Sequence, residues 1–270
     1  MSANTEWQLS GNAAELYEEY LVPTIFIPWA QRLLAQKTPQ QGENVLDVAC
    51  GTGIVARMAK ARVGESGRVV GVDLNAGMLD VARAVVPEGL IEWVQADVGD
   101  MPLTDQTFDV AYCQQGLQFF PDKVGALREI GRLLRPGGEC LVVVAQSLEQ
   151  NPLMRSQAAA LSKHVNDSAA AGIRAVCGLP NPEEIAQLFE DAGYVDVEHN
   201  SVDLTLTYRD GRAFVRNGIM STPLAGIVSG WPEDARNAFL DDILDGFGHY
   251  FDGASLAFPH VSSVVTGTKP

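Results

Sequence analysis

Apolar and polar positions change their spacing along this chain in a regular way. Through the first half, short runs of β-branched and apolar residues alternate with segments of helical period. This alternation indicates a parallel sheet with helices on both faces, joined by right-handed crossovers. The expected strands are 44–49, 68–72, 91–95, 108–113 and 139–145, the last after a turn at 135–138, and the expected helices are 54–61, 76–85 and 123–134.

The pattern differs on either side of this region. Residues 13–36 have helical spacing that Pro23 and Pro28 should interrupt, and residues 147–178 are helical without a strand-like run. The Asn-Pro pair at 181–182 is typical of a helix start, because Asn caps a helix and Pro suits its first turn. The remainder should form strands at 195–197, 202–207 and 255–268 and an amphipathic helix at 232–250. We expect a single domain with a helical insertion, since no repeat or linker is present.

Composition and charge narrow the choice of partner. The chain has 270 residues, of which 46% are hydrophobic and 20% charged, as in ordinary globular proteins. Its net charge is −15, and the 19 basic residues form no cluster. Phosphate backbones and anionic lipids repel such a protein. We therefore expect no nucleic acid partner and no membrane insertion, and we leave a homodimer open.

The cysteines predict buried, reduced thiols and no metal site. Cys50, Cys113, Cys140 and Cys177 form no Cys-x-x-Cys pair, and no histidine spacing suggests zinc. Buried free cysteine is typical of a reducing compartment. Residues 1–7 lack a basic stretch followed by an apolar one, and no apolar run could cross a bilayer. The expected location is the cytoplasm.

The strongest chemical signal is the segment 45–56, where a strand runs into a glycine turn and then a helix. Gly51 and Gly53 permit positive φ and close approach of a ligand, and the helix start offers free N–H groups. Gly51-x-Gly53-x-x-Ala56, followed by Asp73 after the second strand, also fits the dinucleotide fingerprint. An NAD-dependent oxidoreductase is therefore one alternative.

Two further acids favour a cationic ligand over a dinucleotide. Asp47 lies on the first strand, four residues before Gly51, where its carboxylate can face the ligand crevice. A pyrophosphate would be repelled there, whereas the ammonium and sulfonium groups of S-adenosylmethionine (SAM) would be attracted. Asp97 follows the third strand directly, where it can accept a hydrogen bond from an adenine amine.

Five motifs, in order and at suitable spacing, resemble the class I SAM-dependent methyltransferases, in particular the ubiquinone/menaquinone-type branch with its many natural-product enzymes. The resemblance implies a Rossmann-like, doubly wound α/β fold with a mostly parallel seven-stranded sheet, an antiparallel last strand and a helical cap. It also implies one methyltransferase domain over 1–270, with a cap at about 1–40, a SAM-binding core at about 41–147, a substrate-side insertion at about 148–180 and a C-terminal part at 181–270. The motifs are 45–56, 70–74, 94–98, 108–112 and 133–138.

The resemblance also implies roles for individual residues toward SAM and its product S-adenosylhomocysteine. Asp73 accepts both ribose hydroxyls, Asp97 holds the adenine amine, and Asp47 contacts the amino group of the methionine moiety. Tyr20 would lie over the pocket. The full implied cofactor set is Tyr20, Asp47, Ala49, Cys50, Gly51, Thr52, Gly53, Asp73, Leu74, Met78, Ala96, Asp97, Val98, Gln114 and Gln115.

The acceptor side is less well defined. His164 lies in the insertion that should roof the pocket, so it is the first candidate for a general base. Residues 113–117 do not have the Asn-Pro-Pro-Tyr pattern of enzymes that methylate nucleobase or glutamine amines. A small apolar or aromatic acceptor is expected from the residues of the cap and insertion, Phe26, Trp29, Leu153, Met154, Leu161, Phe214 and Met220. A SAM-binding protein without catalysis is the remaining alternative.

Overall fold

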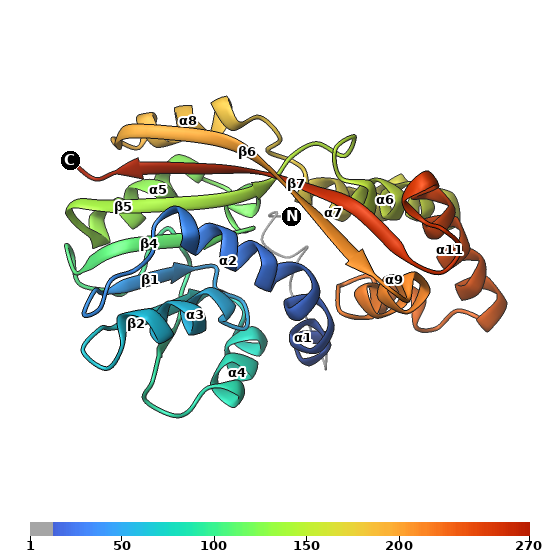
Figure 1. Ribbon diagram of the computed structural model, residues 1–270, viewed down its shortest axis with the longest axis horizontal. Helices are drawn as coiled ribbons and strands as arrows, with labels where there is room; N and C mark the ends of the chain where they lie inside the picture. Colours follow the sequence, from blue (N-terminus) through green and yellow to red (C-terminus); the bar gives the residue numbers. More distant parts are fainter. Residues whose placement is uncertain (1–12) are drawn as a thin grey trace.

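A computed structural model describes residues 13–270, and its centre is one seven-stranded sheet (Figure 1). The strand order is β3-β2-β1-β4-β5-β7-β6, and only β7 runs against the other strands. This confirms the expected doubly wound sheet with an antiparallel last strand. The strands are β1 (Val45–Val48), β2 (Val69–Asp73), β3 (Glu92–Gln95), β4 (Phe108–Gln114), β5 (Leu134–Ala145), β6 (Val195–Tyr208) and β7 (Leu256–Thr268).

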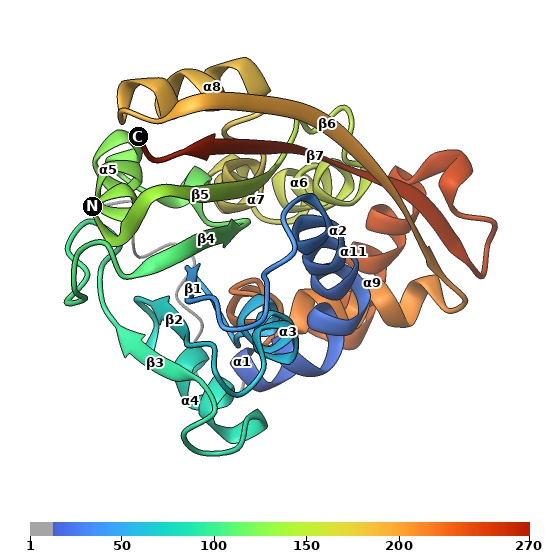
Figure 2. The same ribbon diagram turned by 60° about the vertical axis from the view of Figure 1, so that its left-hand side comes forward.

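Helices cover both faces of the sheet, which explains the nearly continuous apolar runs of its central strands. Alternate residues of β1 show the division, since Val45 packs on one side and Leu46 and Val48 on the other. We call the core on the Val45 side the first core and the core on the Leu46 side the second core. Helices α2 (Ile27–Gln36) and α3 (Ile54–Val63) belong to the first core, and α5 (Lys123–Leu133) and α8 (Pro182–Asp191) belong to the second. Helix α4 (Ala76–Val85) packs beside β2 and β3 (Figure 2).

A helical cap stands beyond the carboxyl ends of the parallel strands, reached by the long strands β6 and β7 (Figures 1 and 2). The expected insertion forms α6 (Pro152–His164) and α7 (Asp167–Val176). A second group of helices lies between β6 and β7. It comprises α9 (Gly211–Met220), α10 (Ala225–Val228), α11 (Glu233–Gly246) and the short η4 (Gly248–Tyr250). Of these, the sequence predicted only the segment of α11 and η4, as one helix. Helix α11 packs on both α6 and α9, so the two groups form one layer.

The N-terminal helix is not interrupted at its prolines, contrary to expectation. Between α1 (Ala13–Leu16) and α2 the chain continues as a π-helix, η2 (Tyr17–Phe26), which contains Pro23. The wider π winding tolerates a proline, which lacks the N–H that a regular helix would need. Pro28 lies in the first turn of α2, where a missing N–H costs little.

Two strand boundaries also differ from the prediction. Strand β5 begins at Leu134 and includes the expected turn 135–138 as a bulge, because Gly137 donates to the Lys269 carbonyl and Lys269 to that of Gly138. The segments 195–197 and 202–207 form one strand, since the polar stretch between them still pairs with β7. The start of α8 is as predicted, and the Asn181 side chain accepts a hydrogen bond from Glu183 N–H.

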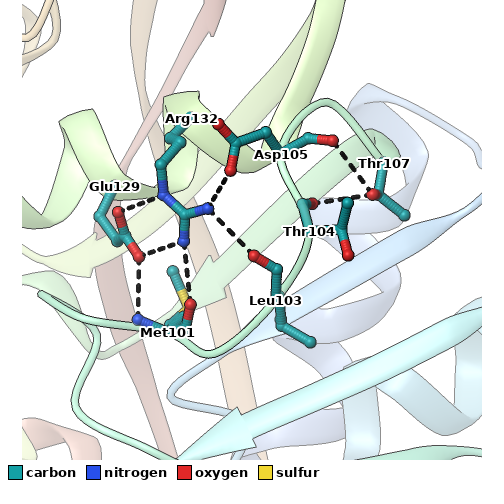
Figure 3. Close-up of polar contacts among 7 residues, drawn as sticks. All are labelled: Met101, Leu103, Thr104, Asp105, Thr107, Glu129 and Arg132. Atoms are coloured by element: carbon teal, nitrogen blue, oxygen red, sulfur yellow. Dashed lines mark hydrogen bonds and ion pairs between the residues drawn. The ribbon is translucent and has the colours of Figure 1, made fainter.

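The connection from β3 to β4 contains no helix and is fixed by Arg132 of α5 (Figure 3). The guanidinium donates to the carbonyls of Met101, at 2.9 Å, and Leu103, at 3.0 Å, and pairs with Glu129 and Asp105. Glu129 in turn accepts a hydrogen bond from Met101 N–H. Charge-assisted bonds to several loop groups hold an irregular segment more firmly than neutral ones.

All four cysteines are buried and free, as predicted. Within residues 13–270, no cluster of His, Cys, Asp and Glu could hold a metal ion, and no helix has the length and apolarity needed to cross a bilayer.

Gly53 caps α3 with a backbone that disfavours other residues. Its φ is +84°, and a Cβ built there would lie 2.1 Å from the Trp93 ring on β3. Left-handed conformation costs a non-glycine residue about 1–2 kcal/mol, and a contact that short adds overpacking. The glycine is therefore required by packing as well as by conformation.

We expect Gly53→Ala to lower the free energy of unfolding by about 3 kcal/mol or more, because conformational cost and overpacking add. Gly137→Ala is the matched control, since Gly137 has φ +81° but open space around its Cβ position. The control should lose only about 1–2 kcal/mol. Urea unfolding measures both, and equal losses would show that Trp93 does not restrict this position.

A buried carboxyl group ties β1 to α3. Asp47 is 1% exposed, and its Oδ2 accepts a hydrogen bond of 2.8 Å from Ala56 N–H. Burial raises the pKa of Asp47 to about 8, although the bond from Ala56 opposes this. The folded protein thus retains a proton that the unfolded chain releases near pH 4.

Because the folded form holds this extra proton, stability should fall as pH rises from about 4 to about 8. The slope for one proton is at most about 1.4 kcal/mol per pH unit. Asp47→Asn keeps an oxygen for Ala56 N–H but cannot ionise, so it should remove this part of the slope. Urea unfolding across the pH range is the measurement, with Asp100→Asn on the exposed loop as control; parallel curves for Asp47→Asn and wild type would contradict the assignment.

Candidate functional site

A cavity of about 310 Å³ lies between the carboxyl ends of the parallel strands and the helical cap. The side of the cavity formed by the sheet, its floor, comes from residues at and just after the ends of β1, β2, β3 and β4. The side formed by helices, its roof, comes from η2, α6, α7 and α9. A crevice at the strand ends is the usual ligand site of open α/β sheets. The sheet therefore supplies one end of the cavity and the cap the other.

Asp73, at the end of β2, is the half-buried acid of the floor. One oxygen of its carboxylate accepts Gly51 N–H at 2.7 Å and the other accepts Asn75 N–H at 2.8 Å. Burial raises the pKa of Asp73, and these backbone donors act in the opposite direction. A carboxylate has about four acceptor positions, so it can receive further donors from a ligand.

The adjoining wall holds the other residues expected near an adenine. Leu74, Met78, Ala96 and Val98 line the cavity together with Asp97. Asp97 is exposed, and its Oδ1 accepts Gly99 N–H at 2.8 Å. It therefore stabilises its own turn, and its other oxygen remains available.

Backbone strain marks the tips of β1 and β4. Ala49 and Gln115 follow these neighbouring strands, line the cavity, and have φ of +53° and +57°. Positive φ at residues other than glycine is costly and clusters at ligand sites. Gly51, at +56°, lines the cavity as well.

Five residues implied by the resemblance do not line the cavity, and one of them is Tyr20 of η2. Cys50, Thr52 and Gly53 belong to the glycine turn without lining the cavity, and Asp47 is buried and bonded to α3. Their positions fix the shape of the turn through packing and backbone bonds. A direct contact between the Asp47 carboxylate and a ligand in this cavity is therefore not part of the geometry.

Tyr17, not Tyr20, reaches the cavity from the N-terminal helix. Tyr17, Leu21 and Ile25 all line it, a spacing of four that follows the winding of η2 and turns Tyr20 away. Burial and the nearby Asp73 carboxylate raise the pKa of Tyr17. The resemblance implied Tyr20 over the pocket, and the structure places Tyr17 of the same segment in the lining.

Three glutamines at the end of β4 and just beyond it line the cavity, and two of them have a side-chain oxygen without a partner in the described chain. Gln114 donates from Nε2 to the Phe26 carbonyl, while its buried Oε1 has no partner in the described chain. Gln115 is anchored, since its Nε2 donates to Ser262 and its Oε1 accepts Ala145 N–H. Gln118, which sequence reasoning missed, also lines the cavity with an unpartnered Oε1.

His164 is not at the cavity, which corrects the candidate general base. It lies at the end of α6, bonded to Asp242 and packed against Trp231 and Phe239 of the cap. His260 of β7 lines the cavity instead. The signal that could have found it is the alternation on β7, which places His260 on the same inward face as Phe258 and Ser262.

The cap end of the cavity is lined mainly by apolar side chains, and they include some of the residues expected there. Phe26, Leu153, Met154 and Phe214 line it. Of the other predicted wall residues, Trp29 and Leu161 belong to the core, and Met220 packs against that core. The additional apolar lining comprises Leu21, Ile25, Phe119, Phe120, Ile173, Val176 and Val215.

The charge of the cavity separates the two cofactor alternatives. Its floor carries Asp73 and Asp97, and among residues 13–270 no lysine or arginine lines it. A dinucleotide would bring two phosphate charges toward two carboxylates without a basic partner. A ligand with positive charge is favoured by the same field.

Known proteins resemble this chain in sequence and fold. Residues 46–142 match the family model described as a methyltransferase domain. A ubiquinone/menaquinone biosynthesis C-methyltransferase of Xanthomonas campestris pv. campestris is 40% identical over 119 residues, which are 43% of this chain and 47% of that protein. The chain thus spans about half the length of that relative.

A second relative is matched over more of its length. The 2-phytyl-1,4-naphtoquinone methyltransferase of Thermosynechococcus vestitus is 33% identical over 183 residues, 63% of this chain and 80% of that protein. Phosphoethanolamine N-methyltransferase 2 of Haemonchus contortus, solved in complex with S-adenosyl-L-methionine, shares the fold at a TM-score of 0.59 and 19% identity, covering 90% of this chain and 52% of that one. The chain therefore belongs to the SAM-dependent methyltransferases, in the ubiquinone/menaquinone-type branch.

Proposed function

We propose that this protein transfers a methyl group from SAM to a small, mainly apolar aromatic acceptor of the quinol type. The observation that carries the proposal is the cavity itself, which is acidic and free of basic side chains at the sheet, within the described residues, and apolar at the cap. Its two ends suit a cationic cofactor and an apolar acceptor in contact with each other. The names of the quinone methyltransferases among its relatives support the choice of acceptor.

The residues present fit SAM. Asp73 would accept the ribose hydroxyls with the acceptor positions that Gly51 and Asn75 leave unused. The buried, unpartnered Oε1 of Gln114 suits an ammonium donor at the methionine end. The adenine would lie against the wall that holds Asp97, and the complete proposed set is Tyr17, Ala49, Gly51, Asp73, Leu74, Met78, Ala96, Asp97, Val98, Gln114 and Gln115.

Bound SAM supplies a methyl group already activated by its sulfonium. The protein then needs to align the acceptor and keep water away, and positioning of this kind is a large catalytic term. Apolar side chains from α6, α7 and α9 close the acceptor end. Asp73 and Asp97 favour the positive charge of the cofactor through the field at the floor.

The floor of the cavity disfavours the NAD alternative. Asp73 would suit the ribose of either cofactor. The phosphates of a dinucleotide, however, would meet a floor without lysine or arginine among the described residues.

We expect Asp73→Asn to weaken SAM binding by about 10-fold or more, because charge-assisted hydrogen bonds to hydroxyls become neutral ones. Titration calorimetry with SAM and with NAD measures this, with thermal unfolding as a check on folding. Asp100→Asn, on the exposed loop beyond Asp97, is the charge-matched control and should bind SAM as wild type does. NAD binding in place of SAM, or an unaffected Asp73→Asn, would place the ribose elsewhere.

Wild-type protein should move an isotope-labelled methyl group from SAM to a short-chain reduced naphthoquinone. Enlarging the apolar end with Leu153→Ala or Phe214→Ala removes acceptor contacts, so KM for the quinol should rise by about 10-fold for a lost side chain of this size, while SAM affinity is unchanged. Lys163→Ala, on the outer face of α6, is the control. SAM binding without transfer to any aromatic acceptor would instead indicate a binding protein without catalysis.

A further inference from the structure

His260 is the one histidine that lines the cavity in the described chain, and it is 3% exposed. It lies on β7 between Phe258 and Ser262, all on the face that meets the cavity and the first core. The proposed set for SAM does not use it. Ser262, two residues from His260 on the same strand, accepts a hydrogen bond from Gln115, which also lines the cavity.

Trp29 determines which nitrogen of His260 carries the proton. The Trp29 ring is fully buried, and its Nε1 lies 3.0 Å from His260 Nδ1. An indole N–H can only donate, so Nδ1 must offer its lone pair. The single proton of a neutral imidazole then resides on Nε2.

The surroundings keep this ring neutral. Burial lowers the pKa of His260 to about 4, so the imidazole carries no charge at neutral pH. Taking up a proton at Nδ1 would also break the bond from a buried indole N–H, which costs about 1–3 kcal/mol. The ring is therefore a poor proton acceptor in this position.

The bond from Trp29 engages Nδ1, so Nε2–H is the group of the ring that can meet a ligand in the cavity. Gln118 is a polar residue with unused hydrogen-bonding capacity, and a chain of hydrogen bonds connects it to the strand of His260. Gln118 donates to Gln115, and Gln115 donates to Ser262, two residues from His260 on the same face of β7. Gln118 is 8% exposed, and its Oε1 is buried without a described partner.

A buried polar atom without a partner, such as Gln118 Oε1 in the described part of the chain, is rare and often marks a ligand position. A donor from His260 and an acceptor from Gln118 are complementary to an oxygenated ring, which carries both lone pairs and hydroxyl protons. The apolar residues Leu153, Met154 and Phe214 would contact the rest of such a molecule.

Building on the proposed function, we propose that His260 binds the methyl acceptor as a neutral hydrogen-bond donor, from Nε2–H to a ring oxygen, and that Trp29 fixes this tautomer. No proton is transferred to or from the imidazole in this role. His260 thus selects an acceptor that presents an oxygen lone pair at this point, and it is not the general base of the reaction.

Nitrogen NMR of the wild-type protein tests the tautomer without any activity measurement. The shifts of His260 should show an unprotonated Nδ1 and a protonated Nε2 across neutral pH, and His260→Asn identifies the signals by their loss. The opposite tautomer, or a ring that protonates near neutral pH, would overturn the proposal.

Two amide variants separate the donor role from a base role. His260→Asn places its amide near the Nδ1 position, so it can still pair with Trp29 but does not reach the acceptor. His260→Gln reaches farther and offers an amide N–H near the Nε2 position. With the reduced naphthoquinone as acceptor, KM should rise by about 10-fold or more for His260→Asn and change by less than about 3-fold for His260→Gln, at similar kcat, because a lost donor to a neutral ligand oxygen has about this size.

The outcomes distinguish this inference from the proposed function. A loss of kcat by orders of magnitude in both variants, with KM unchanged, would show that His260 is a base and contradict the inference. An unchanged KM in His260→Asn would contradict it as well. If wild-type protein neither binds SAM nor methylates the quinol, the proposed function itself fails, and SAM calorimetry on wild type shows this separately.

Discussion

The hydrogen bond from Gly51 N–H to the Asp73 carboxylate is the contact on which the site depends. It joins the tip of β1 to the tip of β2 and sets the distance between the glycine turn and the Asp73 carboxylate. Behind it, Asp47 holds the start of α3 through Ala56, and Trp93 fills the space beside Gly53. Contacts with buried residues thus fix the backbone of the glycine turn, and the side of the turn that lines the cavity is left to contact a ligand.

The cavity combines two environments that come from different parts of the chain. The strand tips provide an acidic floor, and the helices η2, α6, α7 and α9 provide an apolar roof. Because β7 also carries His260 and Ser262, the same strand that supports the cap brings polar groups to the boundary between the two environments. A reaction between a charged cofactor and an apolar ring needs such a boundary, where both reactants meet away from water.

The sequence predicted what depends on local pattern and missed what depends on distant packing. The first five strands and the helix start at Asn181 were found because apolar runs, glycines and caps are local signals. Tyr20 was named from the resemblance alone, and no local signal indicates the π winding that brings Tyr17 to the cavity. His164 was preferred to His260 because its bond to Asp242, 78 positions away, and the bond from Trp29 to His260, 231 positions apart, are set by tertiary structure. Helix α9 was missed because its burial comes from η2 and α11.

The central claim is that the ribose of an adenosyl sulfonium cofactor lies against Asp73 with its charged end toward Gln114. A crystal structure of the complex with S-adenosylhomocysteine tests it most directly. The account predicts both ribose hydroxyls within hydrogen-bonding distance of the Asp73 carboxylate and the amino group beside Gln114 Oε1. Density for the ligand elsewhere, or a cavity that stays filled by side chains at saturating ligand, would contradict it.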